Sequence, residues 1–337
     1  MKKERFDQIT KHSLKGYFGD RLLDKVGMTY EVPEIILDTY KICDMIFSEG
    51  GIDIYFAISI KTGQKFVIKF IPNNHPNKPL YVQGADHLRA MNHAAIVTLS
   101  DTTEIPNYFL VILPYLTGGN LLHCIHEKGP ITKDAAIQVM WNLVSALNYV
   151  HQLGYIHNNI RPENIHILSE YQMNPFAILG GFEYSATGGN TKIITAPDLY
   201  SAPETIETRV GTQASDVYAL GMVFYVMVCG MSPHSYLDYL RTLQTPEVYP
   251  SLAFSGPLWA KERVDTSIKE LIAGMIDSNP EQRLTITECA AQGCFQAYLL
   301  SGGKSTTALQ ILKDCYRSVQ WVLDLADPFQ SIDGRYY

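Results

Sequence analysis

The hydrophobic periodicity of the chain changes near Gly118-Gly119, and this change constrains the fold more than any other feature. Residues 52–60 alternate with a period of two, a turn follows at Gly63, and residues 66–70 alternate again, so we expect a β-hairpin. A helix over about 79–92 and a strand over 110–115 complete this first, β-rich part.

After the two glycines the pattern becomes helical. Apolar residues of 137–150 recur at a spacing of about 3.6, between Thr132 as N-cap and Gly154 as a stop. Residues 215–230 are apolar on nearly all sides, which predicts a buried helix. Thr285 and Glu288 form the pattern of a capping box. The sequence therefore predicts an α+β protein with two lobes and a ligand cleft between them.

Composition narrows the class of protein. The chain has 337 residues, 46% of them hydrophobic, and a net charge of −7 without any cluster of basic residues. We therefore expect no nucleic-acid partner and no membrane partner. Six cysteines without a paired spacing, a polar N-terminus and apolar runs too short for a bilayer favour a cytoplasmic location.

Eight short motifs occur in a fixed order along the chain. They are VIK at 67–69, HAAIV at 93–97, LPYLTGGNL at 113–121, HNNIRPEN at 157–164, GGFE at 180–183, SAPE at 201–204, SDVYALG at 215–221 and DSNPEQR at 277–283. In this order and spacing they resemble the eukaryotic protein kinase family. The resemblance covers about residues 40–296 and implies a bilobed kinase-like fold, with a small β-rich N-lobe and a larger helical C-lobe.

The resemblance also implies domain boundaries. They are an N-terminal extension at 1–37, the N-lobe at 38–116, the C-lobe at 117–297 and a C-terminal helical tail at 298–337. In the tail, one helical face would carry Leu309, Leu312, Tyr316, Val319 and Leu323, either docking on the C-lobe or binding a partner.

Five residues match structural positions of the family. His157 would pack beneath the metal-binding loop, where Phe182 keeps its packing role. Asp216 would hold the backbone of the catalytic loop, and Glu204 with Arg283 would form a buried ion pair. The resemblance therefore implies a retained scaffold.

The catalytic positions, by contrast, are altered. Asn159 stands where the family has the aspartate that accepts or orients the proton of the substrate hydroxyl, and an amide takes no proton near neutral pH. Gly181 replaces the metal-binding aspartate, so Asn164 would be a weak metal ligand by itself. Glu183 could supply a carboxylate, but it lies two positions later.

The phosphate-binding groups are altered as well. Lys69 matches the lysine that binds the α- and β-phosphates, but Gly84 stands where its glutamate partner is expected and Asp86 points elsewhere. A phosphate ligand and a structural remnant both stay open for Lys69. The three glycines of the phosphate loop are replaced, and the pair Gly50-Gly51 between those positions predicts an ordinary hairpin turn instead.

The nucleotide pocket that the resemblance implies is degenerate. Its walls would be formed by Val67, Leu113, Tyr115, Leu116 and His166. His166 replaces an apolar floor residue, although a histidine satisfied on a half-exposed strand is the alternative. Asn158 replaces the arginine that would bind a phosphorylated activation segment.

A retained scaffold beside altered catalytic groups indicates a pseudokinase that acts as a scaffold or allosteric binding module. We expect no required cofactor, and protein partners such as an active kinase or a substrate. Two alternatives stay open: a switch that binds ATP without Mg²⁺, and a weak Ser/Thr kinase that uses Glu183.

Overall fold

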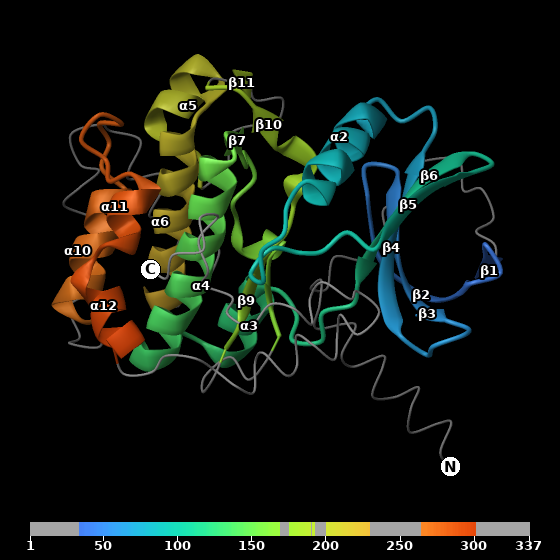
Figure 1. The fold of residues 1–337 in the computed structure, drawn as a ribbon, viewed down its shortest axis with the longest axis horizontal. Coiled ribbons are helices and arrows are strands. Elements are labelled where there is room, and N and C mark those ends of the chain that lie inside the picture. Colours follow the sequence, from blue (N-terminus) through green and yellow to red (C-terminus); the bar gives the residue numbers. More distant parts are fainter. Residues whose placement is uncertain (1–33, 169–174, 190, 193–199, 230–263, 301–337) are drawn as a thin grey trace, which may run out of the picture.

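A computed structural model describes residues 34–168, 175–189, 191–192, 200–229 and 264–300. Figure 1 shows a β-sheet at one end of the molecule, a group of helices at the other, and helix α2 between them. The expected bilobed α+β architecture is therefore confirmed. The tail helix that was expected around Leu309–Leu323 lies outside the described residues.

The sheet has six antiparallel strands in the order β1-β2-β3-β4-β6-β5. The strands are β1 (Ile35–Ile36), β2 (Tyr40–Glu49), β3 (Ile52–Ser59), β4 (Lys65–Pro72), β5 (Asp101–Ile105) and β6 (Tyr108–Pro114). The hairpin expected from the alternation is β3–β4, and its turn contains Gly63 at φ +70°. Strand β1 lies within residues 1–37, which were expected to form an extension before the sheet. The sheet therefore begins earlier in the chain than expected.

The side chains of β4 alternate between the two faces of the sheet. Phe66, Ile68 and Phe70 are buried in the hydrophobic core of the sheet. Val67 and Lys69 lie on the opposite face. Helix α2 (Lys78–Arg89) follows β4 and packs against the chain of the other lobe.

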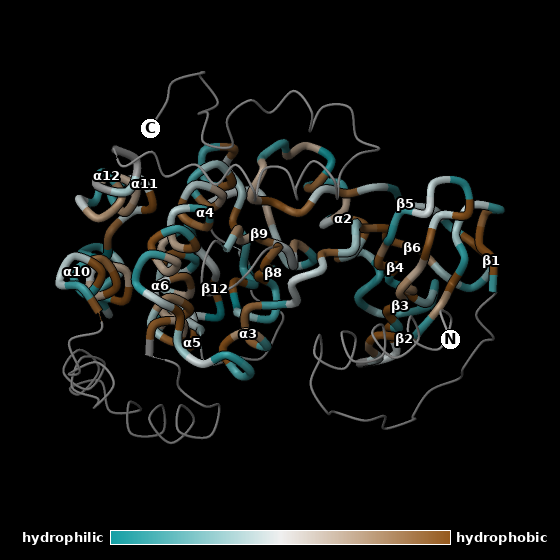
Figure 2. Tube along the Cα trace, turned by 90° about the horizontal axis from the view of Figure 1, so that it is seen from below, coloured by the Kyte–Doolittle hydropathy of each residue, from teal (hydrophilic) through white to brown (hydrophobic). Residues whose placement is uncertain are grey.

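The helical lobe is built around a large apolar core, and Figure 2 shows hydrophobic residues recurring along α4 and α6. Its helices are α3 (Leu121–Lys128), α4 (Lys133–Gln152), α5 (Pro203–Thr208), α6 (Gln213–Cys229), α10 (Thr266–Met275), α11 (Ile286–Ala290) and α12 (Gly293–Leu300). The N-cap of α4 is Thr132, and Gly154 follows its end at φ +78°. The capping box of Thr285 and Glu288 is present at the start of α11.

Short elements connect the helices and carry several of the sequence motifs. They are β7 (Tyr155–Ile156), η1 (Pro162–Asn164), β8 (Ile165–Ile167), β9 (Ala177–Leu179), η2 (Phe182–Tyr184), β10 (Ala186–Thr187), β11 (Thr191–Lys192) and β12 (Val210–Gly211). Strand β8 pairs with β9, β7 with β10 and β11 with β12. Among the described helices, none has the length and apolar character needed to cross a bilayer.

An ion pair ties the start of α5 to the turn before α11. Arg283 donates from its Nη1 and Nη2 atoms to the two carboxylate oxygens of Glu204, at 2.6 and 2.9 Å. Its side chain is fully buried, donates further to the carbonyls of Asp277 and Ala214, and lies over the ring of Tyr218. This charge therefore depends on Glu204 for neutralisation.

Replacing Glu204→Gln should destabilise the protein by about 3–5 kcal/mol, because the buried guanidinium of Arg283 loses the carboxylate that neutralises it. Chemical denaturation of the full chain measures the change. The control is Lys133→Met, which breaks the exposed pair with Asp265 and should lower the stability far less than Glu204→Gln does. Equal losses in the two variants would contradict this account.

Candidate functional site

The loop at residues 157–164 is held in place by one buried carboxylate on α6. Asp216 accepts hydrogen bonds from the backbone N–H groups of His157 and Asn158, at 2.7 and 2.9 Å, and contacts Nε2 of His151 at 3.0 Å. Asn158 adopts φ +61°, a left-handed conformation that asparagine tolerates better than most residues. The helix thus fixes the start of the loop.

The buried imidazole of His157 connects this loop to the segment before η2. Its Nδ1 accepts from the N–H of Asn159, so Nε2 carries the proton and donates to the carbonyl of Gly180 at 2.9 Å. Burial lowers the pKa of His157 to about 4, which keeps the ring neutral. The ring of Phe182 packs edge-on against it, with 4.5 Å between centroids. Through these contacts, His157 and Phe182 serve the packing of the protein interior.

The amide side chains of the loop bond to the protein's own backbone. Nδ2 of Asn159 donates to the carbonyl of Gly181 at 3.2 Å, and Nδ2 of Asn164 donates to the carbonyl of Asn159 at 2.8 Å. A Cβ atom added at Gly181 would lie 2.4 Å from Cγ of Asn164, and Gly181 itself has φ +80°. Asn164 therefore fills the space that a side chain at position 181 would need.

Lys69 forms a salt bridge with Glu183 of η2. Both side chains are mostly buried, with exposed fractions of 19% and 13%. Burial lowers the pKa of Lys69 to about 8, and the adjacent carboxylate favours its protonated form. Lys69 is therefore not solvated. Its partner is not on α2, where Gly84 has no side chain and Asp86 pairs with Arg89.

The β2–β3 connection is a tight turn rather than an open phosphate loop. Glu49 pairs with Ile52, and the two residues between them, Gly50 and Gly51, have φ +60° and +85°. His75 fixes the tip of this hairpin. Because Nδ1 of His75 accepts from the N–H of Asn77, Nε2 donates to the carbonyl of Gly50 at 2.9 Å.

Several of the residues expected to line a nucleotide pocket contact other apolar side chains. Phe56 pairs with Val67 across strands β3 and β4, and its ring packs edge-on against Tyr115 at 4.9 Å. Leu116 is buried, and Leu113 packs partly buried against two of the apolar clusters.

His166 lies on β8 in a partly buried position, against Gly180, where a Cβ would come within 3.4 Å of its Nε2. Burial chiefly, and the charge of Lys69 in addition, lower the pKa of His166 to about 4. A neutral imidazole and a nearby ammonium therefore stand where the family resemblance implies a flat apolar floor.

Two further residues of the loop have partners within the chain. Arg161 forms a two-point ion pair with Glu163, with both contacts at 3.1 Å. Nδ2 of Asn158 donates to the carbonyl of Tyr184 at 3.1 Å, so this neutral residue bonds directly to the last residue of η2. Its Oδ1 atom is buried without a hydrogen-bond partner.

These residues do not fit a magnesium–nucleotide complex. Magnesium is usually held through one or two carboxylates together with phosphate oxygens. Gly181 has no side chain, and the carboxylate of Glu183, the acidic residue of this segment, is engaged by Lys69. In the described part of the chain no three His, Cys, Asp or Glu residues cluster as metal ligands.

The Lys69–Glu183 pair is the contact that sequence reasoning missed. The motifs suggest a replacement metal ligand for Glu183, and a phosphate ligand or a structural remnant for Lys69. The available signal was the simultaneous loss of a glutamate at position 84 and gain of one at position 183.

Comparison with known proteins supports the family. Residues 50–295 match the family model of the protein kinase domain. The chain is 27% identical over 256 residues to human calcium/calmodulin-dependent protein kinase type 1B, covering 75% of this chain and 74% of the relative. It is 26% identical over 270 residues to rat serine/threonine-protein kinase DCLK1, covering 77% and 60%, and 28% identical over 256 residues to human DCLK2, covering 74% and 33%.

Replacing Gly181→Asp, which restores the family's metal ligand, should destabilise the protein by about 1–3 kcal/mol more than Gly154→Asp. The two glycines have nearly equal φ angles of +80° and +78°, but nothing lies within 4 Å of a Cβ at position 154. The difference between the two variants in chemical denaturation therefore isolates the overlap with Asn164. If both lose the same stability, Asn164 moves aside freely and the space is available.

Proposed function

Because this chain belongs to the protein kinase domain family, we propose that it is a member that does not transfer phosphate. It would act instead as a scaffold or allosteric binding module for other proteins. The observation that carries this proposal is the overlap between the side chain of Asn164 and a Cβ atom placed at Gly181, the position where the family has a metal-binding aspartate.

The other catalytic groups support the same proposal. Asn159 carries no charge, and its Nδ2 atom bonds to the carbonyl of Gly181. An amide at this position cannot act as a general base, a role that typically contributes about 10²–10⁴-fold to a reaction rate. Lys69 pairs with Glu183 of the other lobe and not with a carboxylate on α2, where the family has its glutamate partner.

Partners and location follow as parts of the proposal. The charge of the chain, −7 without a basic cluster, favours protein partners over nucleic acid or anionic membranes. An active kinase or a kinase substrate would suit a domain of this fold, and a cytoplasmic location suits cysteines that are free in the described residues. No cofactor is required for this role.

A second function has support from the relatives, which are named as protein kinases. A weak Ser/Thr kinase would need Glu183 to leave Lys69 and to hold a metal ion together with Asn164. A switch that binds ATP without metal would use Lys69, the backbone of residues 113–116 and Asn164. Each of the three functions gives a different response to nucleotide.

Thermal unfolding of the full chain with ATP, alone and with Mg²⁺ or Mn²⁺, should show no shift of the midpoint. A ligand present at 100 times its Kd would stabilise the native state by about 2.7 kcal/mol, which is readily measured. An active kinase in the same assay serves as the positive control.

A shift without metal would overturn nucleotide independence and support the switch. A metal-dependent shift together with phosphate transfer to a generic peptide, lost in Lys69→Met, would establish a kinase and end the proposal.

A further inference from the structure

The salt bridge between Lys69 and Glu183 joins the two lobes of the molecule. Lys69 lies in the centre of the sheet, where it pairs with Ile54 of β3 and Val111 of β6. Glu183 lies in η2, within the segment that follows the β8–β9 hairpin of the helical lobe. A bond between these side chains therefore resists separation of the sheet from the helical lobe.

A glycine in α2 makes this geometry possible. A Cβ at position 84 would lie 2.6 Å from the carbonyl oxygen of Phe182 and 2.9 Å from Cα of Glu183. Glycine weakens a helix interior relative to alanine, so the close approach of two backbones is the physical reason for it here. Compared with the family pattern, glycine at position 84 removes the glutamate carboxylate from α2. It also lets η2 come close enough for Glu183 to supply a carboxylate to Lys69.

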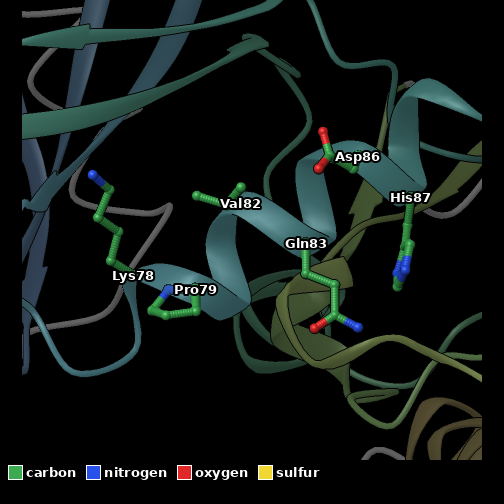
Figure 3. Close-up of a pocket in the computed structure, with 6 residues that line it drawn as sticks. All are labelled: Lys78, Pro79, Val82, Gln83, Asp86 and His87. Atoms are coloured by element: carbon green, nitrogen blue, oxygen red, sulfur yellow. The ribbon is translucent and has the colours of Figure 1, made fainter.

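Two polar contacts flank this close approach on the same side of α2. His87 and Gln83 point from the helix toward the chain of η2 and β10 in Figure 3. Nδ1 of His87 lies 2.8 Å from Oγ of Ser185, and Nε2 of Gln83 donates weakly to the carbonyl of Ser185 at 3.5 Å. Oγ of Ser185 donates its hydrogen to the carbonyl of Phe182, so it accepts from His87.

We infer that Lys69, Glu183 and Gly84 form a latch that holds the lobes together in the absence of nucleotide. The latch deepens the proposed function and rests on it in one respect. If no nucleotide binds, no phosphate competes with Glu183 for Lys69. Taking either partner away would leave a mostly buried, unpaired charge, which is strongly unfavourable. The closed arrangement is therefore a property of the chain alone.

The test is a double-mutant cycle on the full chain without nucleotide or metal, with Lys69→Met, Glu183→Gln and the double variant. The equilibrium constant of unfolding and the hydrogen exchange of α2 and residues 182–185 are measured. Each single variant should raise both, and the cycle should give a coupling of roughly tenfold or more in the unfolding constant. A coupling below about twofold, or exchange that rises only elsewhere, overturns the latch.

The matched control is the pair of Lys78 and Glu104. It also begins on α2, but it stays within the sheet lobe, and Glu104 is 63% exposed. The cycle of Lys78→Met and Glu104→Gln should give a coupling below about fivefold, as exposed pairs do, without raising exchange in residues 182–185. Coupling and exchange equal to those of the first cycle would show that the latch has no special role.

Gly84→Ala gives an independent test, since helix propensity and the latch predict opposite signs. Alanine should raise the unfolding constant and the exchange of residues 182–185, although it is the better helix former. The control is Gly293→Ala at the start of α12, where a Cβ has open space. Stabilisation by Gly84→Ala would overturn the latch.

The results also separate the two proposals. Absence of coupling removes the latch but leaves the altered metal site unchanged. Metal-dependent phosphate transfer by the wild-type chain removes the proposed function, whereas the coupling measured without ligand would still stand.

Discussion

The close approach of helix α2 to the backbone of Phe182 and Glu183 is the contact on which the pairing of Lys69 with Glu183 depends. It requires a residue without a side chain at position 84, because any Cβ there would overlap the carbonyl of Phe182. Once the two backbones are in contact, Glu183 lies within reach of Lys69, and the charge of the sheet lysine is neutralised by the other lobe.

Several polar side chains near Lys69 and the 157–164 loop form hydrogen bonds with the protein's own backbone. The amides of Asn159 and Asn164 bond to backbone carbonyls of the neighbouring chain, and His75 holds the tip of the β2–β3 hairpin. By contrast, the scaffold contacts of Asp216 serve the backbone of the loop and would be needed whether or not the loop is catalytic.

Much of the architecture could be predicted because local rules encode it. Alternation around Phe66 and Phe70 identified a strand with one buried face, and the spacing of apolar residues identified α4. The Gly50-Gly51 turn was predicted from its residue types, since both positions need positive φ. The functional site was less accessible, because a motif letter reports what a residue replaces and not what it contacts.

Lys69 illustrates this limit. Its position in the sheet follows from the sequence, and so does the absence of a glutamate at position 84. Its actual partner is 114 positions away, in a segment whose distance from the sheet depends on how the lobes pack. The overlap between Gly181 and Asn164 is likewise a matter of ångströms between two loops.

By itself, the sequence determined the β3–β4 hairpin, strand β6, helices α2, α4 and α6, the order of the motifs and the chemical identity of each altered group. These are properties of neighbouring residues, which periodicity, capping and turn chemistry report directly. Only the tertiary structure decided which group satisfies which, because the distance between α2 and η2 results from the packing of the two lobes. That distance places the carboxylate of Glu183 on Lys69.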